Sequence, residues 1–452
     1  MQYVDITRLV DEGPFGRTRF LVALLCCLAV FTDGFDTQAI GYIAPALVSE
    51  WHIAKPVLAP VFASSLIGLM FGALIFGPFS DRKGRKTALI ISVAIFGMFS
   101  LLTATVNSVE ALLAMRFLTG LGLGGVMPNA VALTSEYAPA RIRSTVVMCM
   151  FCGFSLGAAL GGIAAGALID ELGWRSVLIV GGLTPLVLVP LLLIYLPESL
   201  DFMVAKCVPR TRIEAAIARI APETVLTPDA NFIRHTTDLP VSSVAQLFSN
   251  GRAATTLMFW LIFFMSLLQL YLFSSWLPIL LHESGLTVSA AVTTSSFFQI
   301  GGTAGTLLLG RFIDRLRPFI MLSVVYLGAA ASVVLLGLSV RGGYVASALA
   351  ILAAGFCIVG GQIAANALAA RTYPTAIRAT GVGWAFGVGR LGSIVGPLLG
   401  GALLALKWDP AHVFILGCIP ALVASVAAMV LHSRSAIHDA APAQETLQSR
   451  NI

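Results

Sequence analysis

The chain has 452 residues, of which 58% are hydrophobic and only 11% are charged, and its formal net charge is +6. Soluble proteins carry about 25% charged residues, so this composition excludes a soluble enzyme and a disordered chain. Because one spanning helix and its loop use roughly 35 to 40 residues, the length predicts about twelve spans.

Apolar runs long enough to cross a membrane recur along the whole chain. Runs this long and continuous favour helices over barrel strands, since hydrocarbon leaves no partner for open backbone groups. We therefore expect an all-α membrane protein with twelve transmembrane helices in two pseudo-symmetric six-helix bundles. The spans are expected at residues 20–47, 57–79, 87–106, 110–137, 144–169, 175–196, 254–281, 289–312, 319–340, 343–370, 378–406 and 411–432.

A long polar stretch divides these spans into six and six. Its composition predicts a short surface helix around residues 211–220 and no catalytic module. The expected organisation is a cytoplasmic N-terminal segment at 1–19, an N-terminal bundle at 20–196, a cytoplasmic linker at 197–252, a C-terminal bundle at 253–432 and a cytoplasmic tail at 433–452.

Lys and Arg residues distinguish the two sides of the membrane. Loops on the side of the amino terminus hold 22 of the 28 basic residues, and the opposite loops hold 4. Basic residues concentrate in cytoplasmic loops, so we expect both termini in the cytoplasm of a multi-pass inner-membrane protein. The CxxC at Cys149 and Cys152 lies inside a span, and we interpret it as a pair of small packing residues.

The first span carries two carboxylates, Asp33 and Asp36, three residues apart and near or just beyond mid-depth. This spacing places both on one face of a helix. Desolvation and mutual repulsion each favour protonating at least one of them. We interpret the pair as proton-coupling groups; the alternative is that both are hydrogen-bonded packing groups.

A basic loop follows the second span. Residues 77–86 read GPFSDRKGRK, and a shorter copy, GRFIDR, stands at residues 310–315. The glycines permit a tight turn, and Asp81 can cap a helix or pair with a guanidinium. We interpret this loop as a gate latch; the alternative is a cluster of charges that only sets topology.

Two arginines lie inside spans. Arg116, in the fourth span, is about 9 Å from its outer end, and Arg390 is close to the middle of the eleventh. We assign Arg116 to proton coupling or carboxylate pairing, with snorkelling to the interface as the alternative. The planar fork of Arg390 suits a substrate carboxylate; the alternative is a standing ion pair with Asp33, Asp36 or another internal acid.

Polar and aromatic residues on these and neighbouring spans complete a candidate substrate pocket. The alternative for each is a packing or lipid-facing role. These candidates are Gln38, Tyr42, Asn129, Phe154, Gln269, Gln299, Gln362, Asn366 and Trp384.

The two halves of the chain are similar at a nearly constant offset. Arg143 and Arg378 are 235 residues apart, and so are Gly157 and Gly392. In transporters, such a parallel duplication places the binding site between two six-helix halves near the bilayer midplane.

Several of these motifs resemble those of a known superfamily. The loop at 77–86, the RxxxGxG pattern that begins at Arg116 and the glycine pattern at 153–162 are similar to motifs of the major facilitator superfamily. In the last of these, Ala158 stands where the antiporter motif has proline, which argues for uptake. Residues 31–47, FTDGFDTQAIGYIAPAL, resemble the aromatic acid:proton symporter family, as do segments in nearly all other spans.

This resemblance implies proton-coupled uptake of aromatic carboxylates, such as 4-hydroxybenzoate, protocatechuate or benzoate, by alternating access. It implies no cofactor beyond protons as the coupling ion, no nucleic-acid partner and a monomer in the lipid bilayer. The residues assigned to gating are Asp81, Arg82, Arg85, Glu136, Arg143, Asp314 and Arg315.

Other functions stay open at this stage. They are symport of a dicarboxylate, a phenylpropanoid or another organic anion, proton-driven drug export, and a membrane receptor for the same acids. An enzyme is disfavoured because the sequence has no metal cluster, nucleophile triad or phosphate-binding loop.

Overall fold

The computed structural model describes residues 3–206, 208–220, 231–233, 244–249, 251–312, 317–340, 343–374 and 377–448. Contacts within the chain divide it into two compact units. Unit 1 comprises Met1–Ile53 and Pro60–Asp238, and unit 2 comprises Ala54–Ala59 and Leu239–Ile452. The division near residue 238 falls inside the polar stretch expected to be a linker.

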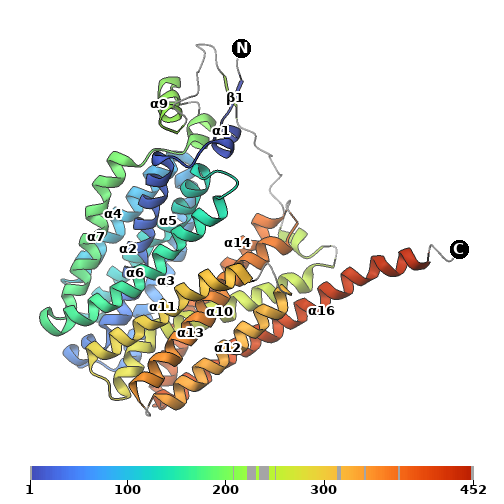
Figure 1. Ribbon diagram of the computed structural model, residues 1–452. Coiled ribbons are helices and arrows are strands. Elements are labelled where there is room, and N and C mark those ends of the chain that lie inside the picture. The colour runs from blue at the N-terminus through green and yellow to red at the C-terminus, as the bar shows by residue number, and fades with distance from the viewer. Residues whose placement is uncertain are drawn as a thin grey trace. The chain divides into compact units, whose positions relative to one another are not determined.

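Long helices account for nearly all of both units (Figure 1). In chain order, unit 1 is built mainly from α2 (Arg17–Trp51), α3 (Leu58–Lys83), α4 (Arg85–Thr103), α5 (Val109–Tyr137), α6 (Arg143–Leu172) and α7 (Trp174–Tyr195). Unit 2 contains η1 (Lys55–Val57), η2 (Val244–Leu247), α10 (Ala253–Glu283), α11 (Val288–Phe312), α12 (Pro318–Ser339), α13 (Tyr344–Thr372), α14 (Arg378–Ala405), α15 (Pro410–Leu416) and α16 (Cys418–Gln448).

Within the described residues, twelve helices are 19 residues or longer, as the twelve expected spans require. Eleven segments are both long and apolar enough to cross a membrane. α11 is long enough but more polar, because Thr293, Thr294, Ser295, Ser296 and Gln299 lie in it. Three of these five, Thr294, Ser296 and Gln299, are at most 4% exposed, so α11 turns polar groups into the protein.

The last expected span, 411–432, is interrupted in the structure. α15 ends at Leu416, and α16 begins at Cys418 and continues to Gln448, into the segment expected to be a tail. Pro420 has no N–H to donate to the carbonyl of Leu416, and its ring would clash with that carbonyl in a continuous helix. The helix therefore breaks at Gly417.

Glycines set the closest helix contacts in each unit. A Cβ added to Gly157 of α6 would lie 1.9 Å from the carbonyl oxygen of Phe31 in α2, and one added to Gly392 of α14 would lie 2.2 Å from that of Phe264 in α10. No other residue allows backbones to approach so closely. The pairs α2 with α6 and α10 with α14 are therefore built in the same way.

Short elements form a layer at one end of unit 1, seen beside the label N in Figure 1. β1 (Tyr3–Asp5) pairs in parallel with β2 (Asn231–Ile233), and α1 (Ile6–Glu12), α8 (Leu200–Ala205) and α9 (Arg210–Ile220) lie with them. Ile6 and Val10 of α1 join Ile213 and Ile217 of α9 in the hydrophobic core of the unit. The expected surface helix at 211–220 is thus present, and its isoleucines anchor it to the bundle.

Candidate functional site

The carboxylate of Asp36 lies at the centre of a buried polar cluster in unit 1. The hydroxyl of Ser100 donates to its Oδ1 at 2.5 Å, and Nη1 of Arg116 donates to its Oδ2 at 3.2 Å. Nη2 of Arg116 also donates to the backbone oxygen of Asp36 at 3.1 Å. Both charged side chains have an exposed fraction of 0%. Three helices, α2, α4 and α5, therefore meet at one ion pair inside the membrane-spanning part of the unit.

The charge state of Asp36 decides whether this ion pair can persist. A buried ion pair is held by the mutual attraction of its charges, and breaking it leaves one charge uncompensated. A proton on Asp36 would neutralise the carboxylate and remove its electrostatic attraction to Arg116. Nε of Arg116 has no hydrogen-bond partner among the described residues, so the guanidinium keeps one donor for another acceptor.

Asp33 lies one helical turn before Asp36, and it is 2% exposed. Its Oδ1 accepts a hydrogen bond from the hydroxyl of Thr37 at 3.1 Å. Between the two aspartates, Gly34 lets α2 approach α6, because a Cβ there would lie 2.0 Å from the carbonyl oxygen of Phe154. The structure thus places the Thr37 hydroxyl on Asp33 and the Arg116 guanidinium on Asp36.

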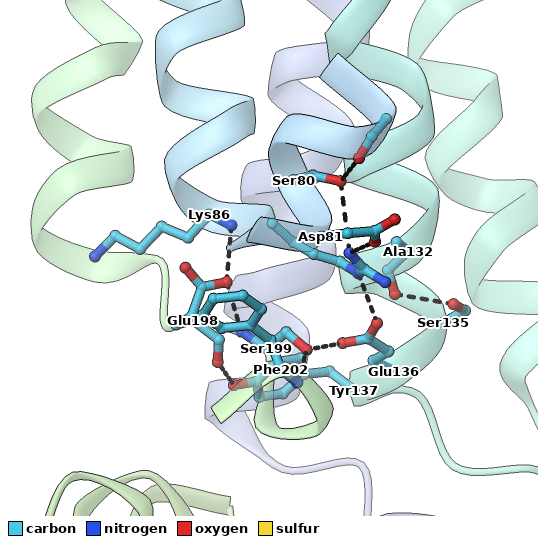
Figure 2. A network of polar contacts seen from close by, with 12 residues as sticks. Ser80, Asp81, Lys86, Ala132, Ser135, Glu136, Tyr137, Glu198, Ser199 and Phe202 are labelled. Atoms are coloured by element: carbon cyan, nitrogen blue, oxygen red, sulfur yellow. Dashed lines mark hydrogen bonds and ion pairs between the residues drawn. The ribbon is translucent and has the colours of Figure 1, made fainter. Parts of the chain in front are cut away.

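A second polar network lies at the turn between α3 and α4 (Figure 2). Arg85 donates through Nη1 to Asp81 at 2.9 Å and through Nε to Glu136 of α5 at 3.0 Å. The hydroxyl of Ser199 donates to the other carboxylate oxygen of Glu136. One guanidinium therefore ties the end of α3 to α5, and Glu136 extends the tie to α8.

Glu198 completes this network, although no role was predicted for it from the sequence. Its Oε1 accepts from the backbone N–H groups of Lys86 and Ser199, both at 3.0 Å, and its backbone oxygen accepts from the hydroxyl of Tyr137 at 2.6 Å. Figure 2 shows the side chain of Lys86 directed away from this carboxylate. Glu198 thus caps the amino end of α4, where a carboxylate also complements the helix dipole.

Gly84 makes room for this cap. Its φ is +102°, and a Cβ there would lie 2.1 Å from Oε2 of Glu198. The glycine in the basic loop indicated a tight turn, but no pattern in the sequence linked it to Glu198. Their distance along the chain, 112 residues between the bonded groups, hid the connection.

Arg143 and Arg378 make equivalent contacts in the two units. Nε of Arg143 donates to the carbonyl oxygen of Ala138 at 3.3 Å, and Nε of Arg378 donates to that of Tyr373 at 3.4 Å. In unit 1, Arg143 also pairs with Asp11 of α1.

Three gating candidates remain. Arg82 is exposed at the end of α3. Asp314 and Arg315, in the second copy of the loop, lie outside the described residues.

Arg19 was not singled out from the sequence, yet its side chain is one of the most deeply buried in unit 1. It is 1% exposed, and its guanidinium donates to the carbonyl oxygens of Val10 at 2.7 Å, Gly13 at 3.2 Å and Leu9 at 3.3 Å. These are the carbonyls at the end of α1, which have no partner within the helix. Arg19 therefore holds the N-terminal segment on the bundle.

Arg390 lies within α14 of unit 2 and is half-buried. In the part of the chain that the structure describes, its guanidinium has no ion pair or hydrogen bond. Gly387 and Gly383 lie one and two turns earlier on the same stripe of the helix, and a Cβ at either position would meet nothing within 4 Å. This face of unit 2 presents a cation beside open space.

Five of the other pocket candidates form side-chain hydrogen bonds. Tyr42 donates to the carbonyl oxygen of Ala158 at 2.8 Å, Asn129 to that of Gly125 at 2.7 Å, and Gln269 to that of Gly417 at 2.8 Å. Gln362 donates to the side-chain oxygen of Asn366 at 3.0 Å. The other four candidates are the buried Gln38 and Gln299, the partly buried Phe154, and Trp384, which is 45% exposed and stacks on Trp260 at 5.8 Å between centroids.

Comparison with known proteins gives consistent results. Residues 26–394 match the family described as Major Facilitator Superfamily. The chain is 42% identical over 431 residues to the 4-hydroxybenzoate transporter PcaK of Pseudomonas aeruginosa, which covers 95% of this chain and 96% of that protein. It is 41% identical to a gallate transporter of Pseudomonas putida, with 94% of each chain covered.

A solved structure shows the same fold. The inward-open xylose transporter XylE of E. coli aligns with 90% of this chain and 95% of its own, with a TM-score of 0.69 at 18% identity. At that identity the likeness concerns the fold alone. The relatives are transporters rather than enzymes, and the match extends over most of the chain. This chain is therefore a multi-pass membrane protein that belongs to the Major Facilitator Superfamily.

Proposed function

We propose that this protein is a proton-coupled symporter that takes up aromatic carboxylates of the 4-hydroxybenzoate type across the inner membrane by alternating access. The observation that carries the substrate class is the 42% identity to a 4-hydroxybenzoate transporter over 95% of the chain. Protons serve as the coupling ion, no cofactor takes part, and the protein works as a monomer with both termini in the cytoplasm.

Arg390 supports the substrate part of the proposal. A guanidinium within a membrane helix is costly unless it is paired or hydrated, and no described residue pairs with it. A benzoate carboxylate fits its planar fork through two parallel hydrogen bonds. The open face at Gly387 and Gly383 offers room for the ring beside that carboxylate.

The Asp36 cluster supports the proton part. The carboxylate of Asp36 is paired with the buried guanidinium of Arg116. Protonation would break this pair, and deprotonation would restore it, so the charge state of Asp36 is linked to the packing of α2, α4 and α5. Asp33 provides a second carboxylate one turn away.

The network of Asp81, Arg85, Glu136 and Glu198 supports a gating role for the turn between α3 and α4. Its ties cross from α3 to α5 and from α4 to the segment that follows α7. Breaking them would free that turn to move.

Uptake of radiolabelled 4-hydroxybenzoate into proteoliposomes tests the proposal. We expect an inward pH gradient to drive accumulation and a protonophore to abolish it. Arg390→Ala should lose uptake, whereas Arg390→Lys should keep part of it because the charge remains without the fork. Arg434→Ala, which changes an exposed arginine of the same unit, is the matched control. Uptake that persists after the gradient is collapsed would contradict the coupling, and normal uptake by Arg390→Ala would contradict the assigned carboxylate site.

Membrane potential separates one coupled proton from two. With one proton, a monoanionic substrate crosses without net charge and a potential has no effect. With two protons, each 100 mV adds about 2.3 kcal/mol, or roughly fifty-fold in accumulation. A substrate panel with gallate, a dicarboxylate and a phenylpropanoate in the same vesicles distinguishes the substrate classes.

A further inference from the structure

A depression lies on the side of unit 1, where α2, α6 and α7 meet. Its volume is about 180 Å³, and its lining includes Phe31, Phe35, Leu160, Ala164, Gly181 and Thr184. The cavity is lined almost wholly by carbon, and apolar cavities of about 150 Å³ stay free of water and take up apolar molecules. The depression therefore suits a hydrocarbon group.

The surface around the depression is apolar and exposed. Leu160 of α6 is 54% exposed, and on α7 Leu183 and Val187 are 48% and 67% exposed. In a multi-pass membrane protein, such a surface on spanning helices is covered by lipid. The depression is continuous with that surface, so the bilayer supplies its occupant.

The depth of the depression selects one part of a lipid. Thr184 lies midway along α7, and Phe31 and Phe35 lie near the middle of α2. A helix of 22 residues is about 33 Å long, close to the thickness of the hydrocarbon core. The middle of such a span lies where lipid chains end, far from the headgroups.

The floor of the depression is also the wall of the Asp36 cluster. The ring of Phe35 packs between Gly161 and Gly181, where added Cβ atoms would lie 2.1 Å and 2.7 Å from ring carbons. A Cβ at Gly181 would lie 3.6 Å from the hydroxyl of Ser100, which donates to Asp36. A group in the depression therefore touches the side chain next to Asp36 in the sequence.

We propose that this depression holds the terminal segment of a phospholipid acyl chain, which packs against Phe35 and supports the wall beside Asp36. Transfer of a chain from surrounding lipid gains no hydrophobic energy, since both environments are hydrocarbon. The gain is van der Waals contact with walls that an empty cavity would leave without partners. The site therefore selects for chain shape and not for headgroup.

Photolabelling tests the site in the full chain, reconstituted in phospholipid nanodiscs. One probe lipid carries a diazirine near the methyl end of an acyl chain, and a second carries it near the ester. After irradiation, mass spectrometry locates the adducts. We expect the methyl-end probe to label the peptides with Leu160 and Thr184 several-fold more than the ester-end probe does.

Two variants fill the depression with the protein's own atoms. Ala164→Phe and Thr184→Phe each place a ring in it, and we expect a several-fold loss of labelling on the opposite wall. Ala167→Phe is the matched control, because Ala167 is exposed on α6 outside the depression. Each variant is used only if gel filtration shows a monodisperse protein. Two filling variants are included so that the test remains possible if one of them does not fold.

Photolabelling does not depend on transport. The link between the acyl-chain site and function rests on the proposed role of Asp36, and the labelling experiment tests the site separately from that role. Labelling unchanged by both filling variants would overturn the acyl-chain site. Equal labelling by both probes would also overturn it, because the chain segment in the depression would then not be the terminal one. If labelling follows the expectation and proton coupling fails, the lipid site stands without the proposed function.

Discussion

Replacing Arg116 with glutamine tests how much the buried ion pair contributes. The change removes the hydrogen bonds to the Asp36 side chain and backbone, at 3.2 Å and 3.1 Å, and leaves the carboxylate with the Ser100 hydroxyl as its donor among the described contacts. Both partners are fully buried, so water screens neither charge. Breaking such a pair costs about 3–5 kcal/mol, because one charge remains uncompensated.

A double-mutant cycle separates this cost from lost packing. Asp36→Asn alone should also lower the free energy of unfolding, since it leaves a buried guanidinium without its anion. The double variant, Asp36→Asn with Arg116→Gln, lacks both charges of the pair, and we expect it to be more stable than the sum of the two losses predicts. Chemical unfolding of the purified protein in detergent micelles measures all four forms. Losses that simply add in the double variant would refute the reasoning, and so would a single variant as stable as the parent.

Two further predictions concern unit 1. Gly84→Ala should lower the free energy of unfolding by at least about 1–2 kcal/mol, because φ is +102° and the new Cβ would displace the Glu198 carboxylate. Gly77→Ala is the control: it lies in α3 with nothing within 4 Å of its Cβ and should have little effect. Equal losses in the two variants would contradict the assignment. Arg19→Ala should expose the N-terminal segment to limited proteolysis, because three carbonyls of α1 and its end lose their donor. Arg8→Ala, which removes an exposed contact to Glu12, serves as its control, and equal protection of both variants would argue against an anchoring role for Arg19.

Much of the fold was predictable because the bilayer restricts the choices. Apolar runs of spanning length must form helices, and the expected runs correspond to the long helices of both units. Local interruptions were harder to place. The break at Gly417 depends on Pro420, but proline also occurs within other spanning helices, including α7 and α14. Its effect at one position depends on whether neighbours satisfy the freed carbonyl, which sequence alone does not specify.

The candidate site was less predictable than the fold. Asp36, Arg116 and Arg390 were identified because a charged side chain inside a membrane span is costly and usually has a function. Ser100 gave no such signal, since serine occurs throughout these helices and its role depends on lying opposite Asp36, 64 residues away. Arg19 lies at the edge of an expected span, where basic residues are ordinary, and only tertiary packing places it under α1.

The repeat shows which residues of unit 2 correspond to the charged residues of unit 1. Pro45 and Pro278 are 233 residues apart, as are the Phe31 and Phe264 carbonyls that meet Gly157 and Gly392. At that offset the counterpart of Asp36 is Gln269, a neutral residue that bonds to Gly417.

The same comparison applies to the two arginines. At the offset of 235 residues that relates Gly157 to Gly392, the counterpart of Arg116 is Ile351 and that of Arg390 is Ser155. Unit 1 thus holds the buried ion pair, and unit 2 holds the arginine without a described partner. Under the proposed function, the proton and the substrate carboxylate are bound by different units.

This division predicts that the proton site cannot be moved by one substitution. In a protein with Asp36→Asn, adding Gln269→Asp should not restore proton-driven uptake, because Ile351 offers no cation to pair with the new carboxylate. Adding Ile351→Arg as well supplies that cation, and we expect it to recover stability in the unfolding assay. Restored uptake with Gln269→Asp alone would show that a carboxylate suffices without its arginine, and the assignment of coupling to the Asp36–Arg116 pair would then be wrong.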